Sequence, residues 1–393
     1  MKTKTIEDFN VKDKRVLVRV DFNVPQDDNG NITDDNRIME ALPTIKYLIS
    51  KDAKVILCSH LGRPIGFDKK FSLLPVQKRL SQILKTDIAF ADDVAGPDSV
   101  QKANELKSGE ILLLENLRFM HEEEENNTEF SKKLASLADI YINDAFGSAH
   151  RKHSSTYGVA EFLPSGAGFL MAKEIEMLST AITNPKRPLI AILGGAKVSE
   201  KIGVIKNLLE NVNTLIIGGA MAYTFLKAQG VNVGNSLVDD NNIKFAISMI
   251  AKAQENNVNL LLPIDHIVAK ELNKDSKSIV TIGAEIPQNL MGMDIGPKTV
   301  KLYKQAIKNG KTIIWNGPLG VFEIKQYCEG TKAILKAVVA SGANSIIGGG
   351  DTASAVINLG YKNKVTHIST GGGASLKLLE GARLPGIEKL QNK

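Results

Sequence analysis

Cysteine, aromatic residues and long apolar runs are all scarce in this sequence. Cys58 and Cys328 are its two cysteines, and neither has neighbours at metal-ligand spacing, which disfavours a disulfide framework and fits a reducing compartment such as the cytoplasm. No run approaches about eighteen apolar residues, and the N-terminal MKTKTIEDFN lacks an apolar segment, so we expect neither a membrane span nor a secretion signal. Aromatic residues make up 5% of the chain, fewer than a groove that stacks nucleic-acid bases would need.

The chain is long, has an ordinary composition and carries a net positive charge. Its 393 residues exceed what one hydrophobic core usually organises, so we expect two domains of roughly 150 to 200 residues each. The 43% apolar and 23% charged residues are typical of a globular protein. A net charge of +6 is compatible with nucleic-acid binding and equally with phosphorylated metabolites as ligands.

Short β-branched runs alternate with longer amphipathic stretches, a pattern typical of parallel sheets flanked by helices. We therefore predict an α/β fold of two Rossmann-like domains, each with a mostly parallel sheet. Residues 169–182 have apolar positions at helical spacing and are predicted to form a helix that joins the domains, with LPSGAG at residues 163–168 as a flexible joint before it. The predicted strands are residues 15–20, 54–59, 111–116, 140–144, 188–193, 214–218, 259–263, 312–316, 344–348 and 366–370.

Arginines and histidines follow the predicted strands of the first half. Ligands of open parallel sheets bind at the carboxyl ends of the strands, where this half has DFNVP, SHLGRP, NLRF and AFGSAHRKH. Several arginines on one rim would make a pocket of forked donors for carboxylate and phosphate groups, although each could instead form a surface ion pair. The residues are Arg63, Arg118, Arg151, His60, His150 and His153, with Arg37 in a polar loop after the first strand.

Glycine clusters follow five predicted strands of the second half, and they indicate a surface that another group approaches closely. Lys197 and Lys201 lie four residues apart after one such cluster, at the expected start of a helix, where both could reach phosphates. In IIGGGDTASA a helix is expected to start near Asp351, with free N–H groups for a phosphate and a carboxylate for a divalent cation. A tight turn with Asp351 as its cap is the alternative.

Common nucleotide fingerprints fit this chain poorly. The sequence has no Walker-type G-x-x-x-x-G-K-[ST], and Gly348, Gly350 and Ala353 match the dinucleotide pattern without the acid expected about 20 residues later. An arginine pocket in one domain and a polyphosphate site in the other favour phosphoryl transfer between a nucleotide and a small acidic acceptor. Closure of the two domains would align the reactants and exclude water.

Eight segments resemble the phosphoglycerate kinase family in order and spacing: VDFNVP, SHLGRP, ENLRF, NDAFGSAHRKHSS, GGAKVSEK, WNGPLGVFE, GGGDT and STGGGAS. The resemblance covers essentially the whole chain and implies transfer between 1,3-bisphosphoglycerate and ADP with Mg²⁺, by a monomer that acts on small molecules. It further implies a phosphoglycerate-binding domain at residues 1–168, a linking helix at 169–184 and a nucleotide-binding domain at 185–379. Residues 380–393 would pack back on the first domain.

The resemblance also implies roles for individual residues, with Asp351 as the magnesium ligand. Phosphoglycerate would be held by Asp21, Asn23, Arg37, His60, Leu61, Gly62, Arg63, Arg118 and Arg151. The transferring group would be stabilised by Arg37, Lys197, Gly371, Gly372 and Gly373. The nucleotide would be bound by Lys197, Lys201, Asn316, Pro318, Glu323, Gly349, Gly350, Asp351 and Thr352.

A few positions depart from the family pattern: Asn36 replaces a common Thr, Ala220 a common Gly, and Tyr327 a usual Phe. The acidic run HEEEENN at residues 121–127 is interpreted as a solvated loop or helix start. Three rival functions remain open: a nucleic-acid binder, an inactive nucleotide-binding scaffold, and another small-molecule kinase with a carboxylate acceptor.

Overall fold

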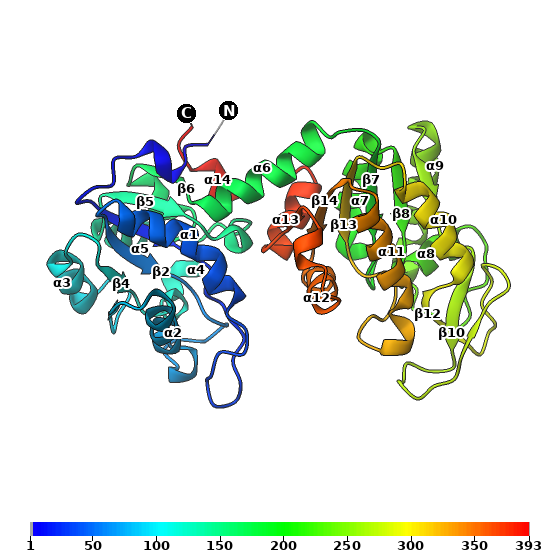
Figure 1. The fold of residues 1–393 in the computed structure, drawn as a ribbon, viewed down its shortest axis with the longest axis horizontal. Coiled ribbons are helices and arrows are strands. Elements are labelled where there is room, and N and C mark those ends of the chain that lie inside the picture. The colour runs from blue at the N-terminus through cyan, green and yellow to red at the C-terminus, as the bar shows by residue number, and fades with distance from the viewer. Residues whose placement is uncertain (1–2, 393) are drawn as a thin grey trace. The chain divides into compact units, whose positions relative to one another are not determined.

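The computed structural model describes residues 3–392 and divides the chain into two compact units (Figure 1). Unit 1 comprises Met1–Glu176 together with Arg383–Lys393, and unit 2 comprises Met177–Ala382. Each unit has its own six-stranded sheet flanked by helices, and its own buried apolar core.

The sheet of unit 1 is parallel throughout and has the strand order β3-β4-β2-β1-β5-β6. Its central strands are runs of Val, Ile and Leu that are buried on both faces, as expected for a parallel sheet covered by helices. The strands are β1 (Arg15–Arg19), β2 (Lys54–Cys58), β3 (Ala89–Phe90), β4 (Ile111–Leu113), β5 (Ile140–Asn143) and β6 (Ser165–Ala167).

The helices of unit 1 begin and end at residues with the expected local chemistry. Pro97 occupies the first turn of α3, where a missing N–H costs nothing, and α2 ends at Lys85 in the left-handed conformation. The helices are α1 (Asn36–Ser50), α2 (Leu74–Leu84), α3 (Pro97–Glu105), α4 (His121–Glu124), α5 (Thr128–Ser136) and α14 (Pro385–Glu388). Helix α6 (Phe169–Thr183) contains the boundary between the units.

Unit 2 contains a second parallel sheet, with the order β15-β14-β13-β7-β8-β9, and a small antiparallel sheet, with the order β11-β10-β12. The large sheet consists of β7 (Leu189–Leu193), β8 (Thr214–Ile217), β9 (Asn259–Leu261), β13 (Thr312–Asn316), β14 (Asn344–Gly348) and β15 (His367–Ile368). The small sheet consists of β10 (His266–Ala269), β11 (Ser278–Val280) and β12 (Met291–Ile295).

The helices of unit 2 complete its core, in which the single tryptophan, Trp315 on β13, is fully buried. Its indole N–H donates to the carbonyl oxygen of Gly317 over 2.8 Å, which ties the end of β13 to the loop that follows it. The helices are α7 (Ile202–Asn211), α8 (Met221–Ala228), α9 (Ile243–Glu255), α10 (Pro297–Ile307), α11 (Glu329–Ala340), α12 (Gly350–Asn358) and α13 (Gly372–Leu379).

The predicted α/β fold class is confirmed, and each of the ten predicted strands overlaps a strand of one of the two large sheets. Two local predictions were wrong. Residues 163–168 are not a flexible joint, because Ser165–Ala167 form the buried edge strand β6 and pair with β5. Arg37 does not lie in a loop, because α1 begins at Asn36.

The C-terminal segment packs against unit 1. The backbone N–H of Gly386 donates to the carbonyl oxygen of Ala149, and Asn143 Nδ2 donates to the carbonyl oxygen of Gly386 over 3.1 Å. A Cβ atom at position 386 would lie 3.0 Å from the Cα of Ala149, so glycine permits this close approach.

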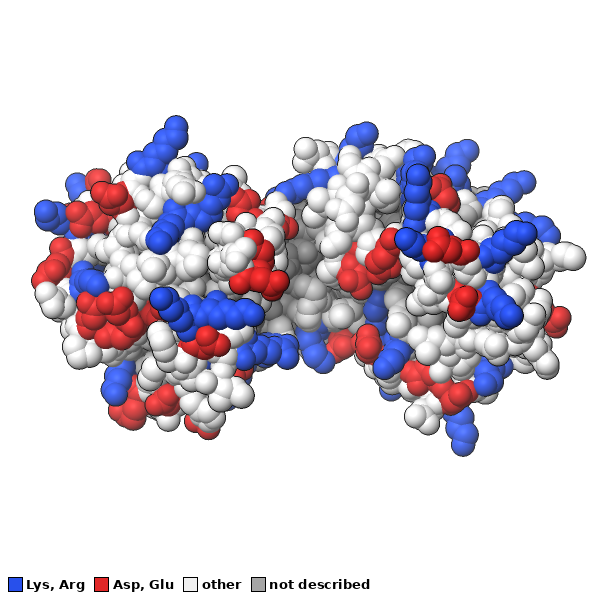
Figure 2. Space-filling view, turned by 90° about the horizontal axis from the view of Figure 1, so that it is seen from below, with Lys and Arg blue, Asp and Glu red and all other residues white. Residues whose placement is uncertain are grey.

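Charged side chains of both signs are interspersed over the face of each unit seen in Figure 2. That face therefore lacks the continuous basic surface typical of a nucleic-acid binder. Within residues 3–392, no helix combines the length and apolar character needed to cross a membrane.

Candidate functional site

The first half-site lies at the carboxyl ends of β1 and β2 in unit 1. These strands are neighbours, with Arg19 opposite Cys58, so the loops that follow them lie side by side. The backbone N–H of Gly62 in the second loop donates to Asn23 Oδ1 in the first over 2.9 Å. Sequence and topology thus bring two of the predicted substrate-binding segments together.

Arg37 reaches this half-site from the first turn of α1. Its NH1 lies 2.6 Å from Asp21 Oδ2, and the Asp21 side chain is largely buried. Burial alone would raise the pKa of Asp21, but the positive charges of Arg37 and Arg19 help to lower it below its ordinary value. Asp21 is therefore an ionised partner that orients the Arg37 guanidinium.

Arg19 is a buried residue of this half-site that the sequence reading missed. Its Nε donates to Ser155 Oγ over 2.8 Å, and its NH2 lies 3.2 Å from His60 Nδ1. Burial lowers the pKa of His60 to about 3, with nearby arginines adding to the shift, so the imidazole is neutral at pH 7. The available signal was a charged residue inside the apolar strand sequence RVLVRV, which parallel strands rarely contain.

The remaining predicted arginines differ in their surroundings. Arg63 is exposed, Arg151 is half-buried, and Arg118 is buried in the 3₁₀ turn Leu117–Phe119 that follows β4. Burial lowers the pKa of His153 to about 3, and the positive charges of Arg118 and Arg151 add to this shift. Both arginines therefore lie near His153. Leu61 is buried beside Asn116, whose Oδ1 accepts from the Leu61 N–H over 3.2 Å.

The acidic run beside Arg118 begins the short helix α4, as one of the two predicted alternatives had it, but it is not solvated throughout, so the prediction was wrong for Glu123. Glu123 is fully buried and accepts from Ser155 N over 2.9 Å and from Ser155 Oγ over 2.6 Å. Glu124 Oε1 lies 2.6 Å from Arg118 NH1. The run therefore places negative charge beside the arginines of this half-site, among them Arg118 and Arg19.

The second half-site is a pocket of about 490 Å³ in unit 2, where glycine-rich loops follow the strands of the large sheet. Its wall contains three predicted nucleotide-binding residues from two different loops, together with apolar side chains that were not predicted. The lining residues include Gly195, Ala196, Gly219, Ala220, Tyr223, Leu272, Met293, Pro318, Val321, Glu323, Ile324 and Asp351. Flat apolar walls and polar ends are typical of pockets that bind a nucleoside.

The N-termini of α12 and α13 lie close together at this half-site. A Cβ atom on Gly372, the first residue of α13, would lie 3.5 Å from the backbone nitrogen of Gly350, the first residue of α12. The helix starts at Gly350, one residue before the predicted Asp351, and its cap is Gly349 with φ +87°, a conformation that favours glycine. Both helix ends direct free N–H groups and positive dipoles to one place.

Lys197 and Lys201 do not both reach outward, contrary to expectation. Lys197 is exposed, whereas Lys201 is buried and its Nζ donates to the carbonyl oxygens of Gly194 and Asn316 over 2.6 and 2.8 Å. Burial lowers the pKa of Lys201 to about 8. Lys201 therefore ties together the ends of β7 and β13.

Thr352 and Asn316 also lie at the base of this half-site. Thr352 Oγ1 accepts from the Gly317 N–H over 2.6 Å, so its hydroxyl oxygen fixes the loop after β13. Asn316 Nδ2 is buried and has no hydrogen-bond partner within residues 3–392. Cβ atoms on Gly348 and Gly349 would lie 3.1 and 3.2 Å from it, so this donor faces the glycine loop before α12.

The half-site also suits a divalent cation that arrives with phosphates. Asp351 is exposed in the first turn of α12, and no cluster of three or more His, Cys, Asp or Glu able to hold a metal occurs within residues 3–392. Mg²⁺ usually takes one or two carboxylates and completes its coordination with water and substrate phosphates. A lone Asp351 beside the glycine-rich loop that precedes α12 fits that donor set.

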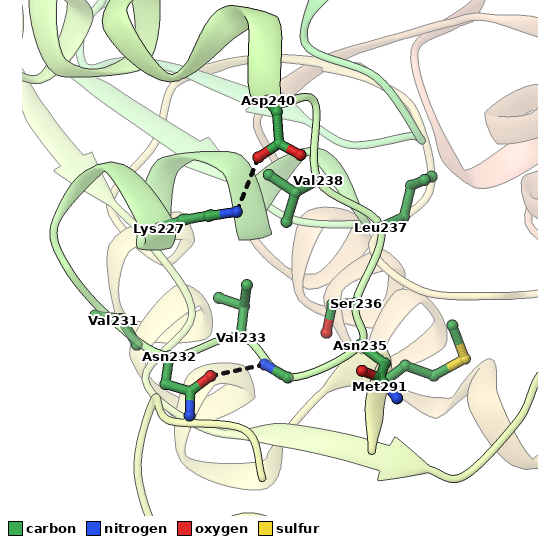
Figure 3. A pocket seen from close by; sticks show the side chains of 11 residues that line it. Lys227, Val231, Asn232, Val233, Asn235, Ser236, Leu237, Val238, Asp240 and Met291 are labelled. Atoms are coloured by element: carbon green, nitrogen blue, oxygen red, sulfur yellow. Dashed lines mark hydrogen bonds and ion pairs between the residues drawn. The ribbon is translucent and has the colours of Figure 1, made fainter. Parts of the chain in front are cut away.

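A further pocket of about 520 Å³ in unit 2 lies away from these residues, because none of the predicted site residues lines it (Figure 3). Its charged and polar groups are paired with one another. Lys227 Nζ lies 2.8 Å from Asp240 Oδ1, and Asn232 Oδ1 accepts from the backbone N–H of Gly234 over 3.1 Å. These contacts give it little unused capacity for a charged ligand.

Comparisons with known proteins show which family this chain resembles. A family model described as phosphoglycerate kinase matches residues 6–382. Phosphoglycerate kinases of Clostridium botulinum (strain Langeland / NCTC 10281 / Type F) and Clostridium kluyveri (strain NBRC 12016) are each 56% identical over 394 residues, or 99% of both chains.

Two solved structures of phosphoglycerate kinases resemble the whole chain. The structure from Coxiella burnetii is 44% identical and has a TM-score of 0.92, covering 99% of this chain and 98% of its own. The structure from Pyrococcus horikoshii OT3 is 35% identical and has a TM-score of 0.86, covering 100% and 98%.

Proposed function

The chain belongs to the phosphoglycerate kinase family, and we propose that unit 1 binds the phosphoglycerate and unit 2 the adenine nucleotide. The family reaction is reversible phosphoryl transfer from 1,3-bisphosphoglycerate to ADP, which gives 3-phosphoglycerate and ATP in glycolysis and gluconeogenesis. The enzyme is thus a phosphotransferase whose acceptor, in the ATP-consuming direction, is a carboxyl group.

One contrast between the units carries the proposal. Arginine and histidine side chains follow the strands of unit 1, whereas glycine-rich loops follow those of unit 2, and Gly350 at the start of α12 has open space where a side chain would lie. Arginine forks suit a ligand with a carboxylate and a phosphate, and helix N-termini suit a chain of phosphates. This difference between the two units supports binding of an acidic acceptor in unit 1 and of a nucleotide in unit 2.

In unit 1, Arg37 is the group that we assign to the transferring phosphoryl. Its ion pair with Asp21 supports this assignment, because the contact holds the guanidinium in a defined position before any ligand arrives. His60 is a neutral hydrogen-bonding group at pH 7 and not a base, because Arg19 lies against its Nδ1 and burial lowers its pKa. We propose that the acceptor is bound by Asp21, Asn23, Arg37, His60, Leu61, Gly62, Arg63, Arg118 and Arg151.

In unit 2, we propose that Asp351 ligates Mg²⁺, which neutralises phosphate charge when it is bound. The N–H groups of residues 349–352 would bind phosphate oxygens, while Pro318 and Glu323 in the pocket wall would contact the nucleoside. The buried Nδ2 of Asn316, which lacks a partner within residues 3–392, supports a ligand close to this loop.

The transfer itself needs charge stabilisation and alignment, because the attacking ADP oxygen is already ionised and requires no general base. We assign stabilisation to Arg37, to exposed Lys197 and to the N–H groups of residues 371–373 at the start of α13. Lys201 acts differently, since its ammonium is bonded to two carbonyl oxygens and holds the nucleotide loops in place. Helix α6 is the segment at which we propose that movement of the units is accommodated.

We further propose that the working form is a monomer in the cytoplasm. Both sets of binding residues lie within one chain, which supports the first point, and the metabolites of glycolysis are cytoplasmic, which supports the second.

The direct test is phosphorus NMR of the purified protein with ATP, Mg²⁺ and 3-phosphoglycerate, with hydroxylamine present to trap the acyl phosphate. ADP should accumulate only when all three components are present, and Arg37→Ala should abolish the signal. ADP formation that does not depend on 3-phosphoglycerate would contradict the assigned acceptor, and normal turnover of the Arg37→Ala variant would contradict the assigned catalytic residue.

A further inference from the structure

The ion pair between Arg118 and Glu124 places an acidic side chain on an arginine of the acceptor site. Arg118 NH1 and Glu124 Oε1 lie 2.6 Å apart. The Arg118 side chain is 6% exposed and the Glu124 side chain 53% exposed, so the arginine is fixed while the carboxylate can exchange with solvent. A contact of this length is a charge-assisted hydrogen bond, the kind that a carboxylate or phosphate ligand would also form.

Arg118 has more donors than its contacts use. Its Nε is buried and has no hydrogen-bond partner within residues 3–392. An unpaired buried donor is costly, so its presence at the edge of an anion site indicates that a ligand completes its hydrogen bonding. The position of Glu124 on the neighbouring NH1 means that an incoming anion meets an arginine that is already partly neutralised.

The short α4 presents Glu124 in this position, and the other acids of the run have different roles. Glu123 faces inward to Ser155, and Glu125 lies 3.4 Å from His121 Nδ1. The α4 helix starts three residues after Arg118, with only Phe119 and Met120 between them, so the last turn of the helix returns Glu124 to the guanidinium. Glu123 is close enough to act on the charge of Arg118, but Glu124 is the member of this run that forms a direct ion pair with it.

We propose that Glu124 is an internal competitor for the acceptor site, which occupies Arg118 in the free protein and is displaced by the phosphoglycerate. Glu124 then weakens acceptor binding, because its ion pair must break before Arg118 can bind the ligand. This inference rests on the assignment of Arg118 to the acceptor site.

The test is calorimetric titration of the full-length protein with 3-phosphoglycerate, comparing Glu124→Gln with Glu125→Gln. Both variants remove one negative charge from the same exposed run, so a general change in the field affects them equally. We expect Glu124→Gln to bind 3-phosphoglycerate roughly twofold to fivefold more tightly than Glu125→Gln, which corresponds to the usual strength of a half-exposed ion pair. Thermal unfolding of both variants checks that each is folded.

The outcomes separate this inference from the proposed function. Equal affinity in the two variants, or weaker binding by Glu124→Gln, would overturn the competitor role, and weaker binding would make Glu124 a support for Arg118 instead. Arg118→Ala is measured in parallel. If this variant binds 3-phosphoglycerate as well as the wild type, Arg118 is not an acceptor residue, and the assignment of the site is wrong together with the inference.

Discussion

Arg37 and Asp21 form an ion pair in which the guanidinium of the first turn of α1 meets the loop after β1, with 2.6 Å between NH1 and Oδ2. The pair joins two segments that the sequence places 16 residues apart, and it holds the arginine before the substrate arrives. A charged group that is already oriented needs little reorganisation when negative charge develops beside it.

We predict that Arg37→Ala lowers kcat by on the order of 100-fold to 1,000-fold, equivalent to about 3 to 4 kcal/mol in the barrier. The dissociation constant for ADP should stay within about twofold of the wild type, because the residues that we assign to the nucleotide lie in unit 2. Arg37→Lys is the matched variant: it keeps the charge but loses the fork, and it should recover only part of the activity. Steady-state kinetics and ADP titration measure both quantities, and a large rise in the ADP constant with normal kcat would contradict the assigned role.

Lys201 and Lys197 should respond differently to the same substitution. Lys201→Met removes a donor from the carbonyl oxygens of Gly194 and Asn316, which are buried, so we expect a loss of about 1 to 3 kcal/mol in the free energy of unfolding. Lys197→Met should change stability by less than about 0.5 kcal/mol, because that side chain is exposed, yet it should lower kcat strongly. Denaturant unfolding and kinetics of both variants test this; equal stability losses would show that burial does not distinguish the two lysines.

Much of this fold could be predicted from the sequence, because most strands of the two large sheets are buried and rich in Val, Ile and Leu. Five strands within residues 3–392 were missed: β10 and β12 belong to the small antiparallel sheet, where the short run HIVA of β10 was overlooked, and the other three lack that signal. β3 has two residues, β6 is the small-residue segment SGA, and β11 is exposed throughout. Their pairing depends on neighbours that the rest of the fold supplies, and a local pattern does not contain that information.

The site was likewise predictable where a local pattern indicates it. Glycines and arginines that follow strands could be selected, because ligands bind at the carboxyl edge of a parallel sheet. The burial of Lys201 was not visible, because the carbonyl of Asn316 that it binds is 115 residues away in sequence. The burial of Glu123 was likewise not predicted, because Ser155, whose hydroxyl donates to its carboxylate, follows 32 residues later.

His60 should make the protein less stable in mild acid. Burial lowers its pKa from the ordinary 6.5 to about 3, so between these values the unfolded chain binds a proton at His60 that the folded chain does not. The free energy of unfolding therefore falls as the pH drops from about 6.5 towards 3, by at most about 1.4 kcal/mol per pH unit from this group.

His60→Asn removes this term, so the difference in stability between wild type and variant should shrink as the pH falls from 6.5 to 4.5. Urea unfolding at several pH values measures this difference. Replacement of exposed His121 by Asn is the control, because its side chain is 85% exposed. A constant difference between wild type and His60→Asn over this range would mean that the pKa of His60 is the same in the folded and unfolded chains.

Asp351 should matter for nucleotide binding only when magnesium is present. Its carboxylate is exposed beside the N–H groups that begin α12, where it would repel bare phosphates unless a cation lies between them. We therefore predict that Asp351→Asn weakens binding of ADP in the presence of Mg²⁺ by at least roughly tenfold. With the metal chelated, the variant should bind ADP as well as the wild type or better, because a repulsive charge has been removed. Isothermal titration with Mg²⁺ and with EDTA separates the two effects, and an equal loss of affinity under both conditions would show that Asp351 acts on the loop itself and not through a cation.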